Sequence, residues 1–156
     1  MKILVLAEIN DGELAEDQTS KTVSAAAKLG KVEVLCASNQ CSDASKKIAK
    51  MENVENVLVL EDDHFAQSLA ESYSETLIDT IRSYSHVFAP SSSFGKNILP
   101  RIAGMLDVMI ISDVSKVISE DTFERPVYAG NAIQTVQSID KVKLISVRTS
   151  NFCFRN

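Results

Sequence analysis

Short apolar runs alternate along this chain with longer stretches in which apolar residues recur at helical spacing. The first run, residues 3–7, is continuously apolar (Ile-Leu-Val-Leu-Ala), which is typical of a strand buried on both faces of a parallel sheet. Three further runs predict strands at residues 32–37, 57–60 and 86–89. Because helical patterns separate these runs, the order of elements indicates parallel strands joined by right-handed crossovers.

The intervening segments predict four helices, over residues 22–29, 42–50, 65–83 and 98–106. Gly30 is placed to end the first helix and Ser42 to cap the second. The third helix has an apolar face formed by Leu69, Tyr73, Leu77, Ile78 and Ile81. Strands and helices in this order predict an α/β fold with three layers and a doubly wound, mostly parallel, Rossmann-like sheet.

The pattern changes in the last third of the chain. Apolar segments follow one another closely there, at residues 108–111, 114–118, 123–129, 132–136 and 143–147. The first two predict one strand with an irregularity near Ser112-Asp113. Gly130-Asn131 is a two-residue hairpin signal between two of the others. We therefore expect a strand-rich, partly antiparallel region that extends the sheet or folds against its edge.

The composition is that of an ordinary globular domain, with 45% hydrophobic and 24% charged residues. A length of 156 residues suits one domain, so we expect residues 1–156 to form a single α/β unit. The net charge is −5 and the sequence has no basic cluster, which argues against nucleic acid as a partner. No apolar run approaches the length of a membrane span.

Cysteine and histidine usage indicates a reducing compartment and gives no zinc pattern. The three cysteines are Cys36, Cys41 and Cys153, an odd number without a C-x-x-C pair or a secretory leader. Cys36 lies in an apolar run, where we expect a small buried side chain. His64 and His86 are far apart in sequence, and His86 begins a predicted strand, so we interpret it as structural.

The loop after the first strand is acidic. It contains Glu8, Asp11, Glu13, Glu16 and Asp17, with no cation before Lys21. These carboxylates would repel a phosphate, and no Gly-x-Gly-x-x-Gly segment is present, so dinucleotide binding at this loop is disfavoured. The spacing fits no known calcium or magnesium loop. We interpret the segment as a solvated acidic loop that could face a partner.

The loop after the fourth strand is the candidate anion site. Ser92, Ser93, Gly95, Lys96 and Asn97 precede a predicted helix, whose free N–H groups would favour an anion. Structural alternatives remain open, and we favour them. Ser93 could simply cap the helix. Pro100 would fit the first turn if the helix begins near Asn97. Lys96 and Arg101 could pair with Asp107 or the acidic loop.

Taken in order, several segments resemble the N-terminal part of the electron transfer flavoprotein alpha subunit. They are residues 2–8, 21–30, 89–97, Pro100-Arg101, Asp107, Ser112-Asp113 and 125–136, and Val147-Arg-Thr149 with Phe152 resembles the end of that domain. Each is weak alone, but their order and spacing cover nearly the whole chain. The resemblance implies a domain related to the adenine-nucleotide alpha-hydrolase and universal stress protein folds. It also implies that the alpha version has lost the nucleotide site, which agrees with the acidic loop.

The resemblance also implies a function. With a beta subunit and FAD, such a subunit carries electrons from flavin dehydrogenases, including the acyl-CoA dehydrogenases of fatty acid oxidation, to a quinone reductase, and is not itself an enzyme. The family holds FAD mainly in a second alpha-subunit domain, whose Ser-Gly-Arg-Gly-type segment is absent from residues 1–156. We therefore expect a scaffold domain without a cofactor of its own, in the bacterial cytoplasm or mitochondrial matrix. The alternative is a stand-alone nucleotide-binding module.

Overall fold

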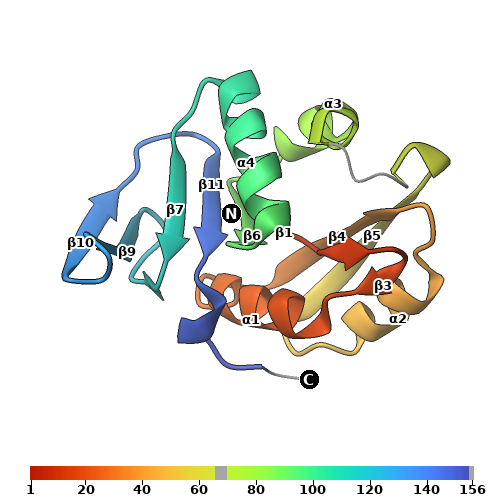
Figure 1. Ribbon diagram of the computed structural model, residues 1–156, viewed down its shortest axis with the longest axis horizontal. Coiled ribbons are helices and arrows are strands. Elements are labelled where there is room, and N and C mark those ends of the chain that lie inside the picture. The colour runs from red at the N-terminus through yellow and green to blue at the C-terminus, as the bar shows by residue number, and fades with distance from the viewer. Residues whose placement is uncertain (66–69, 155–156) are drawn as a thin grey trace.

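In the computed structural model, which describes residues 1–65 and 70–154, six parallel strands form the central sheet (Figure 1). Their order across the sheet is β5-β4-β1-β6-β11-β7. The strands are β1 (Ile3–Leu6), β4 (Val32–Ser38), β5 (Val54–Glu61), β6 (His86–Pro90), β7 (Ile110–Val114) and β11 (Lys143–Val147). All neighbouring strands pair in parallel, which confirms the predicted fold class.

Helices cover both faces of this sheet (Figure 1). Helices α1 (Glu16–Ala26) and α2 (Ser42–Ala49) lie on one face, and α3 (Ala70–Ile81) and α4 (Ser93–Leu106) lie on the other. Successive side chains of a strand point to opposite faces. Accordingly Ile3 and Val5 join the core under α1 and α2, while Leu4 and Leu6 join the core under α3 and α4. The continuous apolar run of β1 thus fills both layers.

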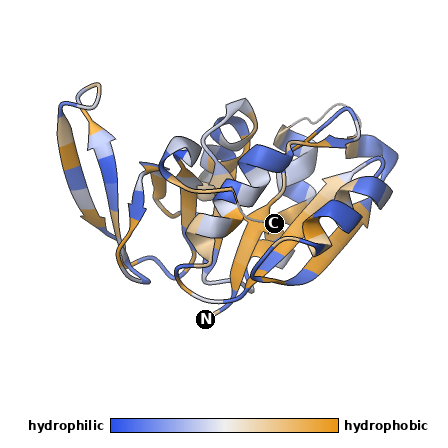
Figure 2. Cartoon of the chain, turned by 90° about the horizontal axis from the view of Figure 1, so that it is seen from below, coloured by the Kyte–Doolittle hydropathy of each residue, from blue (hydrophilic) through white to orange (hydrophobic). Residues whose placement is uncertain are grey.

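The C-terminal third divides between two sheets. Strands β7 and β11 complete the parallel sheet, whereas β8 (Lys116–Val117), β9 (Thr122–Val127) and β10 (Ala132–Gln137) form a separate antiparallel sheet. The β9–β10 hairpin, residues 122–137, projects from the body of the molecule (Figure 2), and we call it the arm. The predicted irregularity near Ser112-Asp113 is confirmed, because Asp113 has φ 55° and the β7–β11 register shifts there.

The predicted two-residue turn in the arm was wrong. Val127 pairs with Ala132, so the loop contains four residues, of which Tyr128, Ala129 and Gly130 have φ of 52°, 55° and 87°. Only the glycine adopts such angles without strain, and the left-handed conformation of a tyrosine or alanine gives no sequence signal.

Two helix starts also differ from the prediction. Helix α1 begins at Glu16 instead of residue 22, because its first turns bury Thr19 and Ser20, which are polar and produce no apolar periodicity. Helix α4 begins at Ser93, so Pro100 lies inside the helix and not in its first turn.

The prediction that Ser42 caps the second helix was wrong, because Ser42 is the first helical residue of α2, Cys41 occupies the cap position and no side chain caps the helix. In the region of the predicted third helix, the structure describes a short 3-10 helix, η1 (Asp63–Phe65), and α3; Leu69 lies outside the described residues. Two further short strands, β2 (Ile9–Asn10) and β3 (Glu13–Leu14), and a 3-10 helix, η2 (Thr149–Asn151), complete the fold. None of the helices in residues 1–65 and 70–154 combines the length and apolar character of a membrane span.

Candidate functional site

The switch point of this sheet lies between β1 and β6. These strands are neighbours, but the helices that follow them, α1 and α4, pack on opposite faces. In open α/β sheets, ligands bind outside the carboxyl ends of the strands at such a point. The loops after β1 and β6 are those that the sequence had singled out, so their geometry decides whether a nucleotide can enter here.

Glu8 occupies the switch point. Glu8 is only 7% exposed. Its carboxylate oxygen Oε1 accepts a short hydrogen bond from the Oγ of Ser92, which lies in the loop after β6. The backbone is fixed as well, because Ala15 N donates to Glu8 O (2.9 Å) and Glu8 N donates to Thr19 Oγ1 (3.3 Å). A carboxylate of the chain itself therefore lies where the phosphates of a nucleotide would have to lie.

The other acids of the first loop lie on the outside. Asp11, Glu13 and Asp17 are exposed, and Asp17 pairs with Lys21 across one helical turn (3.0 Å). The interpretation as a solvated acidic loop is confirmed for these three residues. It was wrong for Glu8, because its partner Ser92 is 84 residues away in sequence.

The five anion-loop candidates do not converge. Ser92 is the cap residue of α4, but its hydroxyl binds Glu8 instead of capping the helix. Ser93 is the first helical residue and is exposed, so the expectation that it caps was wrong. Gly95 is buried, and a Cβ there would lie 1.9 Å from Pro90 O, so this glycine permits close packing of helix on strand. Lys96 and Asn97 are exposed, and of the five only Lys96 lines a cleft.

This cleft, which sequence reasoning missed, lies at the carboxyl ends of β6, β7 and β11. Its volume is about 660 Å³, within the usual range of small-molecule sites. Its walls come from the first turns of α4, the loop of the arm and the segment after β11. The lining residues are Ser91, Lys96, Asp113, residues 126–130, Arg148, Thr149 and Ser150. The three left-handed residues of the arm loop, together with Asp113, thus face one space.

Neither histidine belongs to the switch point or the cleft. His86 is 3% exposed; its Nε2 donates to Glu120 O (2.6 Å) and its Nδ1 lies 2.7 Å from Ser85 Oγ. Burial lowers the pKa of this imidazole from its ordinary value, because a charged ring would lose its hydration. The structural interpretation of His86 is confirmed.

Cys36 is also structural. It is fully buried in the core under α1 and α2, as predicted. Burial, followed by its hydrogen bond with Cys41, raises the pKa of the Cys36 thiol far above its ordinary value, so it remains protonated. All three cysteines are free.

The structure brings together one acid–histidine–hydroxyl group that the sequence had not paired. His64 Nδ1 lies 2.6 Å from Asp62 Oδ1, and His64 Nε2 lies 3.0 Å from Thr76 Oγ1. However, the Thr76 hydroxyl donates its proton to Ser72 O (2.8 Å), so it can only accept from the histidine. The hydrogen bond thus runs in the opposite direction to the one that general-base activation of a nucleophile requires. The group instead links η1 to α3.

Residues 3–154 match the electron transfer flavoprotein domain. The chain belongs to the electron transfer flavoprotein domain family. The resemblance drawn from the ordered segments is thereby confirmed, and with it the assignment to the alpha-subunit branch, since the relatives below carry that name.

Three relatives illustrate the likeness. The chain is 45% identical over 152 residues to the electron transfer flavoprotein subunit alpha of Paracoccus denitrificans, covering 97% of this chain and 49% of that protein. It is 44% identical to the subunit alpha of Pseudomonas aeruginosa, with the same coverage. It is 40% identical to a mitochondrial subunit alpha of Dictyostelium discoideum, covering 96% of this chain and 44% of that protein. The chain therefore spans about half the length of these relatives.

Proposed function

We propose that this chain is the amino-terminal platform domain of an electron transfer flavoprotein alpha subunit, which binds a beta subunit and supports a separate flavin-holding domain without catalysing a reaction itself. One observation carries the proposal: within a family domain matched over residues 3–154, the switch point is filled by the buried carboxylate of Glu8. A domain whose usual ligand position is occupied by its own side chain is suited to supporting another domain.

In the proposed assembly, residues 1–156 form one domain, and FAD lies in the region that makes the relatives about twice as long. The assembled protein would take electrons from flavin dehydrogenases, acyl-CoA dehydrogenases among them, and pass them to a quinone reductase. We place it in the bacterial cytoplasm or the mitochondrial matrix, because relatives come from bacteria and from a mitochondrial protein.

The arm is the proposed docking surface for the beta subunit. Strand β10 pairs only with β9 in the described part of the chain, so its outer edge offers unpaired backbone groups to another strand. Apolar side chains accompany this edge: Ile133 is 60% and Tyr128 81% exposed. An exposed aromatic next to an open strand edge is typical of interface residues.

The test is binding of a cognate beta subunit, measured by co-elution and by titration calorimetry. We expect a stable complex with this chain. Ile133→Asp should weaken it by about tenfold or more, because a charge would be buried at the interface. Val59→Asp is the matched control, since Val59 is also β-branched and 52% exposed but lies on β5, at the opposite edge of the molecule.

Persistent failure to bind the beta subunit at varied salt would contradict the proposal, and equal weakening by both variants would contradict the assignment of the arm. A structure of this chain with ATP or a dinucleotide lodged beside Glu8 and Gly95 would instead support the alternative, a stand-alone nucleotide-binding module.

A further inference from the structure

Two cations meet at the cleft from different elements. Lys96 comes from α4 and Arg148 from the segment after β11, and both line the space. Neither the ammonium nor the guanidinium has a hydrogen-bonded or ion-paired partner among residues 1–65 and 70–154. Arg101, in the same helix as Lys96, instead lies 3.7 Å from Glu71, which corrects the expectation that it pairs with Asp107 or the acidic loop. Two exposed cations without a bonded partner in the described part of the chain thus border one hollow, together with one carboxylate, that of Asp113.

The floor of the cleft is held in place by a buried serine. Ser146, 2% exposed, accepts hydrogen bonds at its Oγ from Ser91 Oγ and from Asp113 N, each 2.8 Å long. The main chain continues the sheet ladder beyond the strand ends, since Ser91 N donates to Val147 O (2.8 Å) and Arg148 N donates to Val114 O (2.9 Å). The backbone that carries Ser91, Asp113 and Arg148 is thus fixed before any ligand arrives, which lowers the entropic cost of binding.

The chemistry of the walls selects a phosphate group. Arg148 and Lys96 supply charged donors, and a guanidinium matches the oxygens of a phosphate well. The hydroxyl of Ser150 lines the same cleft and can donate to a further oxygen. The hydroxyls of Ser91 and Thr149 already donate to Ser146 Oγ (2.8 Å) and Gln18 Oε1 (2.9 Å). The one carboxylate in the lining, Asp113, would repel a phosphate but would accept hydrogen bonds from hydroxyl groups.

We propose that this cleft binds a small phosphate monoester of a hydroxylated compound. Lys96 and Arg148 hold the phosphate, and the hydroxyl groups of the ligand donate hydrogen bonds to Asp113. A sugar phosphate and a nucleoside monophosphate share this chemistry. The site is separate from the switch point, since Glu8 and Ser92 do not line it, and it does not depend on the proposed platform function.

The test is calorimetric titration of the chain with four probes: AMP, ribose 5-phosphate, inorganic phosphate and adenosine. We expect AMP and ribose 5-phosphate to bind more tightly than phosphate, and adenosine not to bind. A preference for AMP over ribose 5-phosphate would identify a nucleotide, and equal affinity would identify a sugar phosphate. Binding should weaken as salt is raised, because both cations are exposed.

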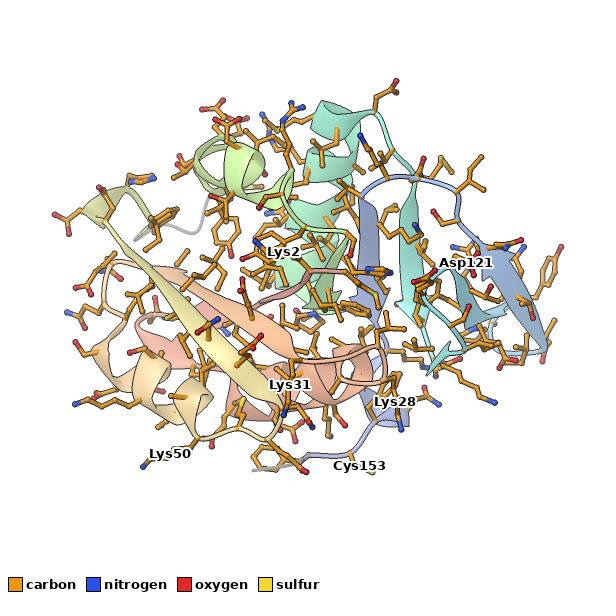
Figure 3. All side chains as sticks on the ribbon, turned by 180° about the vertical axis from the view of Figure 1, so that it is seen from behind. Lys2, Lys28, Lys31, Lys50, Asp121 and Cys153 are labelled. Carbon is orange, nitrogen blue, oxygen red and sulfur yellow. The ribbon has the colours of Figure 1, made fainter. Side chains whose placement is uncertain are left out.

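Lys96→Gln and Arg148→Gln should each weaken AMP binding by about tenfold or more, the scale of one charge-assisted hydrogen bond. Lys50→Gln is the control, because Lys50 is an exposed lysine after α2, far from the antiparallel sheet (Figure 3). Asp113→Asn should reduce the preference for ribose 5-phosphate over inorganic phosphate.

The proposal is overturned if no phosphate probe saturates a site, or if Lys50→Gln weakens binding as much as Lys96→Gln. Lys96→Gln and Arg148→Gln lie outside the arm and should leave binding of the beta subunit intact, so the two proposals are tested separately.

Discussion

Gly95 and Gly104 lie in the same helix, α4, but a methyl group would meet different surroundings at the two positions. A Cβ on Gly95 would lie 1.9 Å from the carbonyl oxygen of Pro90, whereas nothing lies within 4 Å of one on Gly104. Gly95 therefore allows the first turn of α4 to approach the end of β6. Gly104 makes no comparable approach, and its backbone freedom disfavours the helix.

We expect Gly95→Ala to lower the free energy of unfolding by about 1–3 kcal/mol, because the helix must move away from β6. Gly104→Ala should raise it by about 0.5–1 kcal/mol through helix propensity. Urea denaturation of both variants measures the difference. Destabilisation of equal size at both positions would show that contact with Pro90 does not matter.

Single residues were the hardest level to predict from the sequence. Gly95 and Ser92 looked like parts of an anion loop, yet one packs against Pro90 and the other binds Glu8. Both roles depend on contacts that the fold creates, and the local spacing of residues in the sequence does not predict such contacts. By contrast, the roles of Cys36 and His86 could be predicted, since an apolar run by itself indicates burial.

Among the elements, the base of the arm is held together by the carboxylate of one aspartate. Asp121 (labelled in Figure 3) accepts hydrogen bonds from Thr122 Oγ1 (2.7 Å), Ser119 Oγ (2.9 Å) and Gln137 Nε2 (2.7 Å). Its carboxylate thus connects Ser119 and the first residue of β9 to the last residue of β10. These bonds, that from Gln137 first, lower the pKa of Asp121 from 3.8 to about 2, because they favour the ionised form.

The sign of the pH effect follows from that lowered pKa. The contribution of Asp121 to stability is complete above the unfolded pKa of 3.8 and is lost as the pH falls through about 2. We therefore expect wild type to be more stable than Asp121→Asn at pH 6, with the gap closing between pH 4 and 2. Urea midpoints of both proteins across this range measure it, and a gap independent of pH would contradict the role of the carboxylate.

Most elements could be predicted, and their ends could not. Every strand of the central sheet overlaps an apolar run, and the four inner strands, β4, β1, β6 and β11, are buried on both faces. The start of α1 was missed since Thr19 and Ser20 are buried polar residues, and the arm loop was shortened since Tyr128 and Ala129 adopt left-handed angles. Periodicity reports apolar burial alone, so polar burial and unusual backbone angles escape it.

Taken as a whole, the molecule is organised around its last strand. Strand β11 enters the sheet between β6 and β7, and Leu144 and Ile145 are fully buried, one in each core. The two layers therefore share a strand that comes last in sequence among the six strands of the sheet. We infer that the sheet forms as one cooperative unit.

Ile145→Ala should lower the free energy of unfolding by about 2–5 kcal/mol, the cost of a large cavity in a packed core. Val59→Ala, on the exposed edge strand β5, should change it by no more than about 0.5 kcal/mol. Far-ultraviolet circular dichroism and tyrosine fluorescence should give the same midpoint in each protein. Separate midpoints in Ile145→Ala would mean that the two ends of the sheet unfold independently.

The fold class and family could be predicted from the sequence. The alternation of strand and helix patterns, and the order of the segments that resemble the family, extend over the whole chain. The cleft could not, since Lys96, Asp113 and Arg148 come from three separate elements.

The position of β1 and β11 on either side of β6 has a mechanical consequence. All three strands are parallel, so a tension applied at the start of β1 and the end of β11 would load both ladders in shear. Their hydrogen bonds would have to break together and not one after another. Neighbouring polypeptide pulling on residues beyond β11 would thus load the centre of the sheet, and would not separate its strands one hydrogen bond at a time from an edge.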